Sequence, residues 1–278
     1  MAQHWTVAEP TTIDLDETVD ALEVTLVRGR VDVVAGDGPG SRVEVHAVTG
    51  RPLEVDVSGH ALKVGYRNVG FAGFADKFRL FRSDESADVQ ITVPADVALK
   101  LAVVKADGLV AGLRGPVKVS TVSGPVVVDQ CTGHLTVSTV SGELVVRDHT
   151  GDVETSSVSG VVTLAGDVPG IKASTVSGDL TLDLTSTPRS AKISAVSGDV
   201  VLRAPQVDRL TLKLSAASGR VTVDGVEQPD RQHKGVVLTG TKSLGSASVS
   251  VVSGDVTVLE RRAPDGAGDL GATDGRDS

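Results

Sequence analysis

The chain has 278 residues, of which 40% are hydrophobic but only 2% are aromatic. An apolar fraction made largely of valine and leucine, together with 31 glycines, favours many short strands joined by turns over helices. The net charge of −9 argues against a nucleic-acid partner, since phosphate binding needs a clustered basic surface. Because Cys131 is the single cysteine, no disulfide can form within the chain.

Residues 1–20 form an N-terminal segment without a recognisable targeting signal. They lack the basic region and apolar run of a secretory signal, and no apolar run in the sequence approaches the roughly 18 residues of a spanning helix. We therefore expect a soluble, cytoplasmic protein.

Residues 21–95 are predicted to form an N-terminal β region. Apolar and polar residues alternate in the runs 22–26, 42–46 and 53–57, which is the pattern of half-buried strands, and glycine-rich turns separate the runs. Two interpretations remain open. The region is either a small separate sheet that caps the following repeats or a set of irregular early coils of the same structure.

A phenylalanine-rich insertion at residues 70–87 interrupts this β region. It holds all four phenylalanines of the chain, Phe71, Phe74, Phe78 and Phe81, whose spacing of 3, 4 and 3 places them on one face of a helix beside basic residues. One interpretation is a flap that covers an open end of the β core. The other is a group that docks a protein partner or an anionic membrane surface.

Residues 96–260 contain an internal repeat. The tetrapeptide Thr-Val-Ser-Gly, or a close variant, ends at Gly124 and returns at intervals of 18, 18, 18, 20, 21 and 35 residues. Aliphatic residues stand two and four positions after each of these glycines, beginning with Val126 and Val128. A single coil cannot bury such a face alone, whereas stacked coils close a continuous core. The sequence therefore predicts an all-β fold, a parallel β-solenoid with coils of about 18 residues.

The repeat also predicts which side chains face the interior. We expect the aliphatic pairs after each glycine, and the pairs on the other strand such as Leu135 and Val137, to point inward. The valine of each tetrapeptide is a further inward candidate. These valines are Val122, Val140, Val158, Val176, Val196 and Val252.

Two columns of hydroxyl side chains accompany the tetrapeptides. One column contains Ser120, Ser138, Ser156, Ser174 and Ser194, and the next contains Thr121, Thr139, Ser157 and Thr175. A flat outward array could order water or bind a repetitive surface, as ice-binding solenoids do. Because neighbouring residues normally point to opposite faces, we expect instead that these side chains make corners and stacked hydroxyl bonds.

The end of the chain departs from the regular repeat. Residues 225–245 are expected to enlarge the last coil by an insertion. Residues 261–278, rich in glycine and aspartate, are predicted to form a disordered acidic tail.

No pattern in the sequence predicts an active site, a metal site or a cofactor. The six histidines lack metal-ligand spacing, and we expect His134 and His149, which flank successive corners, to be solvated. Cys131 is expected to be a passive thiol. Four aspartates recur after the first strand of a coil, where turn chemistry explains them, and the coils lack the aromatic side chains that usually bind sugars. These aspartates are Asp129, Asp148, Asp167 and Asp183.

At the pattern T-V-S-G-[DE]-[VL]-x-[VL], best seen at residues 139–146 and 175–182, the sequence resembles the bacterial putative-adhesin family, also called toastrack domains. The resemblance covers roughly residues 20–260. It implies a parallel β-solenoid without known catalysis, in a family linked to adhesion and to membrane-associated systems, and it supplies no catalytic residue.

Two functional hypotheses follow. The first is a non-enzymatic scaffold or adhesin-like interaction module that binds a protein partner or a second copy of itself, with contact to a membrane surface as a further option. In this hypothesis Phe71, Phe74, Phe78 and Phe81 are the candidate docking residues. The alternative is a carbohydrate-binding or carbohydrate-cleaving β-helix protein that uses the carboxylates at the corners.

Overall fold

The computed structural model describes residues 2–66, 84–228, 235–240 and 243–262. Within these ranges every regular element is a β-strand except one short 3-10 turn, η1 (Val207–Arg209), and the strands belong to a single sheet. No helix in the described residues has the length and apolar character needed to span a membrane. The all-β prediction is confirmed.

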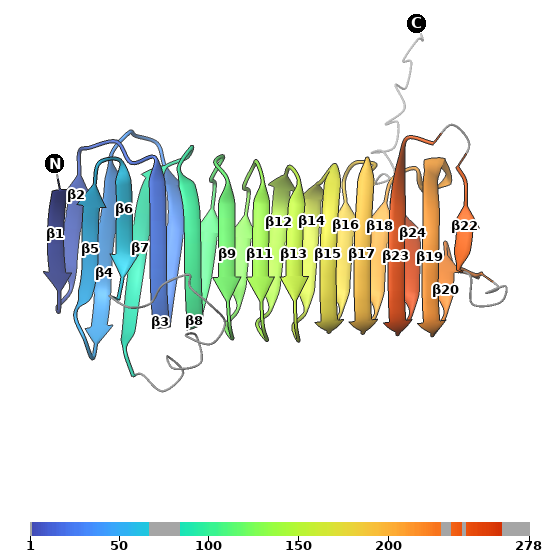
Figure 1. The fold of residues 1–278 in the computed structure, drawn as a ribbon. Coiled ribbons are helices and arrows are strands. Elements are labelled where there is room, and N and C mark those ends of the chain that lie inside the picture. The colour runs from blue at the N-terminus through green and yellow to red at the C-terminus, as the bar shows by residue number, and fades with distance from the viewer. Residues whose placement is uncertain (1, 67–83, 229–234, 241–242, 263–278) are drawn as a thin grey trace, which may run out of the picture.

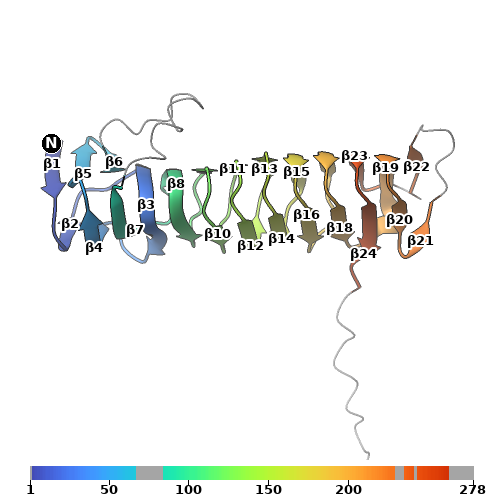
Figure 2. The ribbon, with the colours of Figure 1, turned by 90° about the horizontal axis from the view of Figure 1, so that it is seen from below.

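The sheet is wound into two layers that face each other along the length of the molecule. Figure 1 looks onto layer A, and Figure 2 shows both layers edge-on. Layer A contains, in spatial order, β1 (Ala2–Val7), β5 (Leu53–Ser58), β6 (Ala61–Gly65), the first part of β3 (Ala21–Gly36), the first part of β8 (Ala98–Ala111), β9 (Val117–Thr121), β11 (Leu135–Thr139), β13 (Val153–Ser157), β15 (Gly170–Ser177), β17 (Ser190–Ser197), β23 (Gly245–Ser253), β19 (Leu210–Ser218) and β22 (Val236–Leu238). Layer B contains β2 (Thr11–Leu15), β4 (Ser41–Thr49), β7 (Ser86–Pro94), the second parts of β3 and β8, β10 (Val126–Asp129), β12 (Leu144–Thr150), β14 (Val162–Asp167), β16 (Leu180–Leu184), β18 (Val200–Ala204), β24 (Val256–Glu260), β20 (Val221–Val223) and β21 (Val226–Glu227).

The N-terminal β region is continuous with the repeats. β3 and β8 pair in parallel from Ala21 with Ala98 to Val34 with Ala111, and both strands pass from one layer into the other. On the N-terminal side of β3 the pairing becomes mixed, because β1 with β5, β2 with β4, β4 with β7 and β5 with β6 are antiparallel. The sequence left two interpretations of this region open. The structure agrees with the second, in which the region consists of irregular coils joined to the solenoid.

Aliphatic side chains fill the space between the layers. Val126, Val128, Leu144 and Val146, which follow two successive tetrapeptide glycines, are completely buried or nearly so. In the outermost coil Val223 is only half-buried. The other expected inward pairs are confirmed. Each buried valine or leucine contributes roughly 1.5–3 kcal/mol to the free energy of folding.

The tetrapeptide valines change their orientation along the solenoid. Val122 is buried and Val140 is half-buried, as expected. The inward prediction is wrong for four others, which are 44–54% exposed: Val158, Val176, Val196 and Val252. For Val176, Val196 and Val252 the reason is that β15, β17 and β23 continue through the tetrapeptide, so the alternation that buries the preceding residue turns the valine outward. Val158 is exposed without such a continuation, because β13 ends at the residue before it.

The coil that is last in the sequence is not last in space. β23 pairs in parallel with both β17 and β19, and β24 pairs in parallel with both β18 and β20. The chain therefore skips one coil position after β18, builds the coil of β19 and β20, and then returns to fill the gap (Figure 1). The simple enlargement expected from residues 225–245 is wrong, since these residues include the edge strands β21 and β22 and the return connection.

A stacked glycine marks the sharp corner of each later coil. Gly198 has φ +128°, and a Cβ atom at this position would collide with the carbonyl oxygen of Gly178 in the coil below. Glycine meets both requirements, since it adopts positive φ without penalty and has no Cβ.

Candidate functional site

The outer surface of layer A carries three columns of side chains. Residues two apart on each strand point outward, and neighbouring strands are in register, so equivalent residues stack along the solenoid. The first column holds the lysines Lys100, Lys118, Lys172, Lys192 and Lys213. The second holds the serines Ser138, Ser156, Ser174, Ser194, Ser250 and Ser215, and Ser120 stands in register with them but is buried. The third holds the exposed valines Val158, Val176, Val196 and Val252. We call this surface the lysine–valine face.

The lysine column has a strong excess of positive charge. All five lysines are exposed, and Glu154 is the one carboxylate that stands in their column between β8 and β19. Glu154 accepts a 2.6 Å hydrogen bond from Lys172, which lowers the pKa of this carboxyl. Within the described ranges the other four lysines form no ion pair, so their charges face the surroundings.

The serine column separates the lysines from the valines. Its hydroxyls bond along the stack, since Ser156 donates to Ser138 at 3.3 Å and Ser215 donates to Ser250 at 3.2 Å. The neighbouring column points inward, as expected, and its members are 2–5% exposed: Thr121, Thr139, Ser157 and Thr175. Three of these hydroxyls build corners, since Thr121, Thr139 and Ser157 each donate to the carbonyl oxygen of the glycine three residues later, and Thr139 Oγ1 also accepts from the N–H of Gly142. The buried Thr175 Oγ1 has no hydrogen-bond partner among the described residues.

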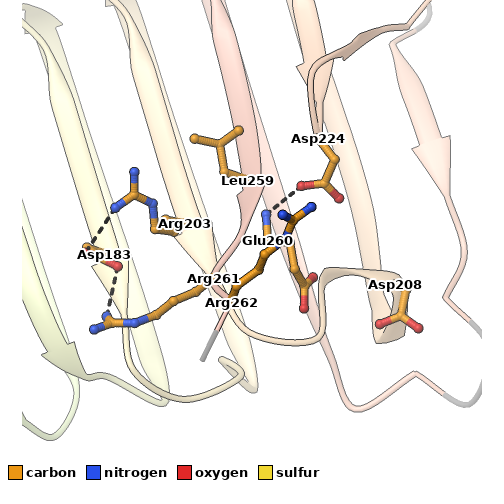
Figure 3. A pocket seen from close by; sticks show the side chains of 8 residues that line it. All are labelled: Asp183, Arg203, Asp208, Asp224, Leu259, Glu260, Arg261 and Arg262. Atoms are coloured by element: carbon orange, nitrogen blue, oxygen red, sulfur yellow. Dashed lines mark hydrogen bonds and ion pairs between the residues drawn. The ribbon is translucent and has the colours of Figure 1, made fainter. Parts of the chain in front are cut away.

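A groove of about 950 Å³ lies at the C-terminal end of layer B (Figure 3). It is lined by Asp183, Arg203, Asp208, Asp224, Leu259, Glu260, Arg261 and Arg262. Asp183, one of the recurring aspartates, accepts a 2.9 Å hydrogen bond from Arg261 and lies 3.6 Å from a guanidinium nitrogen of Arg203. Asp183 is therefore engaged in a three-residue ion-pair network.

Two other carboxylates of the groove support the returned coil, whereas Asp208 is exposed and takes no part in these bonds. The two carboxylate oxygens of Glu260 accept backbone hydrogen bonds from Gln206 at 2.9 Å and Val207 at 2.7 Å. Asp224 accepts from the backbone N–H of Glu260 at 2.6 Å. These bonds connect the last strand of the sequence, β24, to the segments on either side of the coil it fills, so we assign Glu260 and Asp224 a structural role.

The remaining aspartates of the sequence prediction do not gather around the groove. Asp129 stands next to Arg147 in the neighbouring strand, Asp148 lies in a bulge of β12 with φ +48°, and Asp167 is bonded to the hydroxyl of Ser186. No group of three histidine, cysteine or carboxylate side chains suited to a metal ion occurs in the part of the chain that the structure describes.

Cys131 and His149 occupy equivalent inward positions in successive coils. The N–H of Thr132 bonds to the carbonyl of Leu113, and the N–H of Thr150 bonds to that of Cys131. These bonds bring the side chains of Leu113, Cys131 and His149 into one buried column. Burial raises the pKa of the Cys131 thiol and lowers the pKa of His149. The expectation of a solvated His149 is wrong. Its spacing of 18 residues from Cys131 is the signal that places it inside.

Phe71, Phe74, Phe78 and Phe81 lie outside the described residues, so their docking role stays a prediction. The lysine column was missed, although the pattern Lys-x-Ser recurs at residues 118, 172, 192 and 213.

One family model and several solved structures match this chain. A family model described as Toastrack DUF4097 matches residues 19–259. No curated protein gives a match. Similar solved structures include a "putative cell adhesion protein" from Clostridium sporogenes, with 10% identity, TM-score 0.29 and coverage of 91% of this chain and 100% of that one. A "putative lipid binding protein" from Parabacteroides distasonis has 11% identity, TM-score 0.47 and coverage of 92% and 98%. A "putative adhesin" from Bacteroides fragilis has 12% identity, TM-score 0.43 and coverage of 93% and 96%.

Proposed function

Since the chain belongs to the Toastrack family, we propose that it is a non-enzymatic β-solenoid scaffold that binds a protein partner by strand pairing at its N-terminal end. The engaged carboxylates of the groove support the non-enzymatic part of this proposal, because Asp183 and Glu260 both hold neighbouring coils together. For the same reason the carbohydrate-cleaving alternative has less support.

The observation that carries the proposal is the open edge at the N-terminal end. Among the described strands β1 pairs only with β5 and β2 only with β4, so one side of each strand has no strand partner (Figure 2). Both pairings are regular, and neither strand contains proline or lysine. Natural sheets usually protect an edge with such residues, with bulges or with very short strands.

The C-terminal end of the sheet is protected against further strand pairing by very short edge strands. Its outermost strands are β21 with two residues and β22 with three, both antiparallel to their neighbours. Strands of this length offer few backbone groups to a further strand. The contrast between the ends indicates that the N-terminal end, with strands of six and five residues, is the one suited to pairing.

An extended segment of a partner would add to β1 or β2 through backbone hydrogen bonds, with side-chain contacts providing specificity. A second copy of this chain can serve as the partner. A twofold axis normal to the two layers would pair β1 with β1 and β2 with β2 at the same time, and both pairs would be antiparallel, as the existing pairs at this end are.

The chain itself supplies a probe for this test. Trp5, the single tryptophan, lies half-buried in β1, so its fluorescence emission reports on the edge strand. The test compares wild type with Thr6→Lys/Thr12→Lys, which places two exposed lysines on the edge strands, and with Val237→Lys on β22 as the matched control. We expect self-association in sedimentation, or capture of a partner, to shift Trp5 emission in wild type and control and to be weakened about tenfold or more in the edge variant.

Equal association by all three proteins would contradict the proposal. A cysteine introduced at Thr6 provides a second readout, because the native Cys131 is completely buried. Partner binding should protect this cysteine from thiol reagents, and a cysteine at Val237 should remain reactive.

The phenylalanine-rich segment is a second proposed contact. Replacing Phe71, Phe74, Phe78 and Phe81 together by serine should abolish partner capture while the melting transition of the coils is retained. Unchanged capture would rule out this contact without affecting the strand-pairing proposal.

A further inference from the structure

We propose that the lysine–valine face binds the surface of an anionic lipid membrane. This inference concerns a surface other than the N-terminal edge, and it does not depend on the strand-pairing proposal. It rests on the charge of the face, on its exposed apolar column and on its contrast with layer B.

Charge complementarity is the first argument. Five exposed lysines stand in one column against Glu154, which is already paired with Lys172, whereas the chain as a whole carries a net charge of −9. The column extends over eight neighbouring strands, from β8 to β19, which at about 4.8 Å per strand is roughly 34 Å. The lysines therefore form a long positive row on a chain that is otherwise acidic.

Exposed apolar side chains on the same face are the second argument. The valine column runs parallel to the lysines, four residues further along each strand, which places it roughly 13 Å away. Its members are 44–54% exposed: Val158, Val176, Val196 and Val252. Basic residues combined with exposed apolar residues are the features with which peripheral proteins contact anionic lipid surfaces.

The serines between the two columns do not project beyond the lysines and valines. Ser156, Ser174, Ser194 and Ser250 are exposed and are the shortest polar side chains that the strands can present. The long lysine side chains and the valines can therefore approach a flat surface together, with the lysine ammonium groups directed at lipid phosphates and the valines at the boundary with the acyl chains.

Layer B has no comparable positive row in its described residues. In its comparable outward column acidic and basic residues alternate, since Asp129 stands beside Arg147 and Asp183 beside Arg203. Such a column has no net charge over its length. The positive row therefore belongs to layer A and does not follow from the solenoid repeat itself.

Vesicle binding tests the proposal directly. The purified chain is mixed with phosphatidylcholine vesicles that contain or lack phosphatidylglycerol, and the bound fraction is measured by co-sedimentation at low and at physiological salt. We expect binding only to the phosphatidylglycerol vesicles, and we expect it to weaken with salt, because exposed charges are screened over about 8 Å at physiological ionic strength.

Two matched variants separate a specific face from overall charge. Lys118→Glu/Lys192→Glu and Arg147→Glu/Arg262→Glu each replace two exposed basic residues by acidic ones, the first pair on the lysine–valine face and the second away from it. Each lysine near an anionic surface strengthens binding roughly fivefold, so the lysine variant should bind at least about 25-fold more weakly. The arginine variant should stay close to wild type.

The apolar column is tested separately. Val176→Ser/Val196→Ser should reduce vesicle binding severalfold at physiological salt, with little change at low salt, where the lysines dominate. Equal loss in the lysine and arginine variants, or equal binding to both kinds of vesicle, would overturn the proposal. Binding to an acidic protein with no binding to vesicles would also overturn it, since the face would then serve another class of partner.

Discussion

The middle coils and the C-terminal end of the solenoid are stabilised in different ways. In the middle, each coil from β9 to β16 stacks on the preceding one, and the contact is a repeating interior of valine and leucine. At the C-terminal end β23 and β24 fill a position between two coils already formed, and Glu260 and Asp224 bond across these coils. A repeated core is sufficient to stack coils, whereas a coil placed out of sequence order is fixed by specific polar contacts.

A charge in the middle interior should give the largest effect. Val146 is completely buried in β12, so Val146→Asp places an unpaired carboxylate among aliphatic side chains and should cost more than about 4 kcal/mol. Val176→Asp is the matched control, because this valine is 52% exposed and its substitution should change stability by less than about 0.5 kcal/mol. Urea unfolding measures both, and a native-like transition for Val146→Asp would contradict the assigned interior.

The corner that joins the middle to the C-terminal end should be the next most sensitive site. Gly198→Ala introduces a Cβ that collides with the carbonyl oxygen of Gly178 at a φ of +128°, and we expect a loss of about 2–4 kcal/mol. Gly59→Ala separates the two causes, because Gly59 has φ +58° but no atom lies within 4 Å of the place that its Cβ would take. Its cost should be about 1–2 kcal/mol. Equal losses in the two variants would show that stacking at the corner does not demand glycine.

The polar contacts of the C-terminal end should give a smaller and local effect. Glu260→Gln replaces the charged acceptor of two backbone hydrogen bonds by a neutral amide, which should cost about 1–2 kcal/mol. The loss should appear as faster amide hydrogen exchange in β24, with exchange in β12 unchanged. Glu143→Gln, at an exposed corner of the middle coils, is the control and should alter neither strand. Unchanged exchange in β24 would mean that these bonds do not fix the returned coil.

The fold could be predicted from the sequence to the extent that it depends on the repeat. The aliphatic pairs after each glycine define both strands and the interior, and residues such as Val126 and Leu144 are buried as expected. The orientation of Val176 could not be obtained in this way, because it depends on whether the strand continues through the tetrapeptide. Nor could the order of the last coils, since coils with equivalent edges can stack on one another in more than one order.

The lysine column was harder to recognise than the core for a physical reason. Outward positions are not constrained by packing, so the column is interrupted by Thr136, Glu154 and Ser248 and shows no constant interval. Lysines in a charged chain are also normally solvated surface residues. Only the register of the strands brings Lys118, Lys172 and Lys192 into one row.

The smallest predicted effect is a pH dependence that originates in the middle coils. Burial lowers the pKa of His149 below its ordinary value of 6.5, so the unfolded chain takes up a proton at this residue at a higher pH than the folded chain does. Stability contributed by the neutral ring is complete above pH 6.5 and is lost as the pH falls toward the folded pKa, by at most about 1.4 kcal/mol per pH unit. His149→Leu should remove this part of the pH dependence in urea unfolding measured between neutral and mildly acidic pH. His134→Leu, at an exposed corner position, should keep it, and identical pH profiles for wild type and His149→Leu would show that the buried ring does not titrate on unfolding.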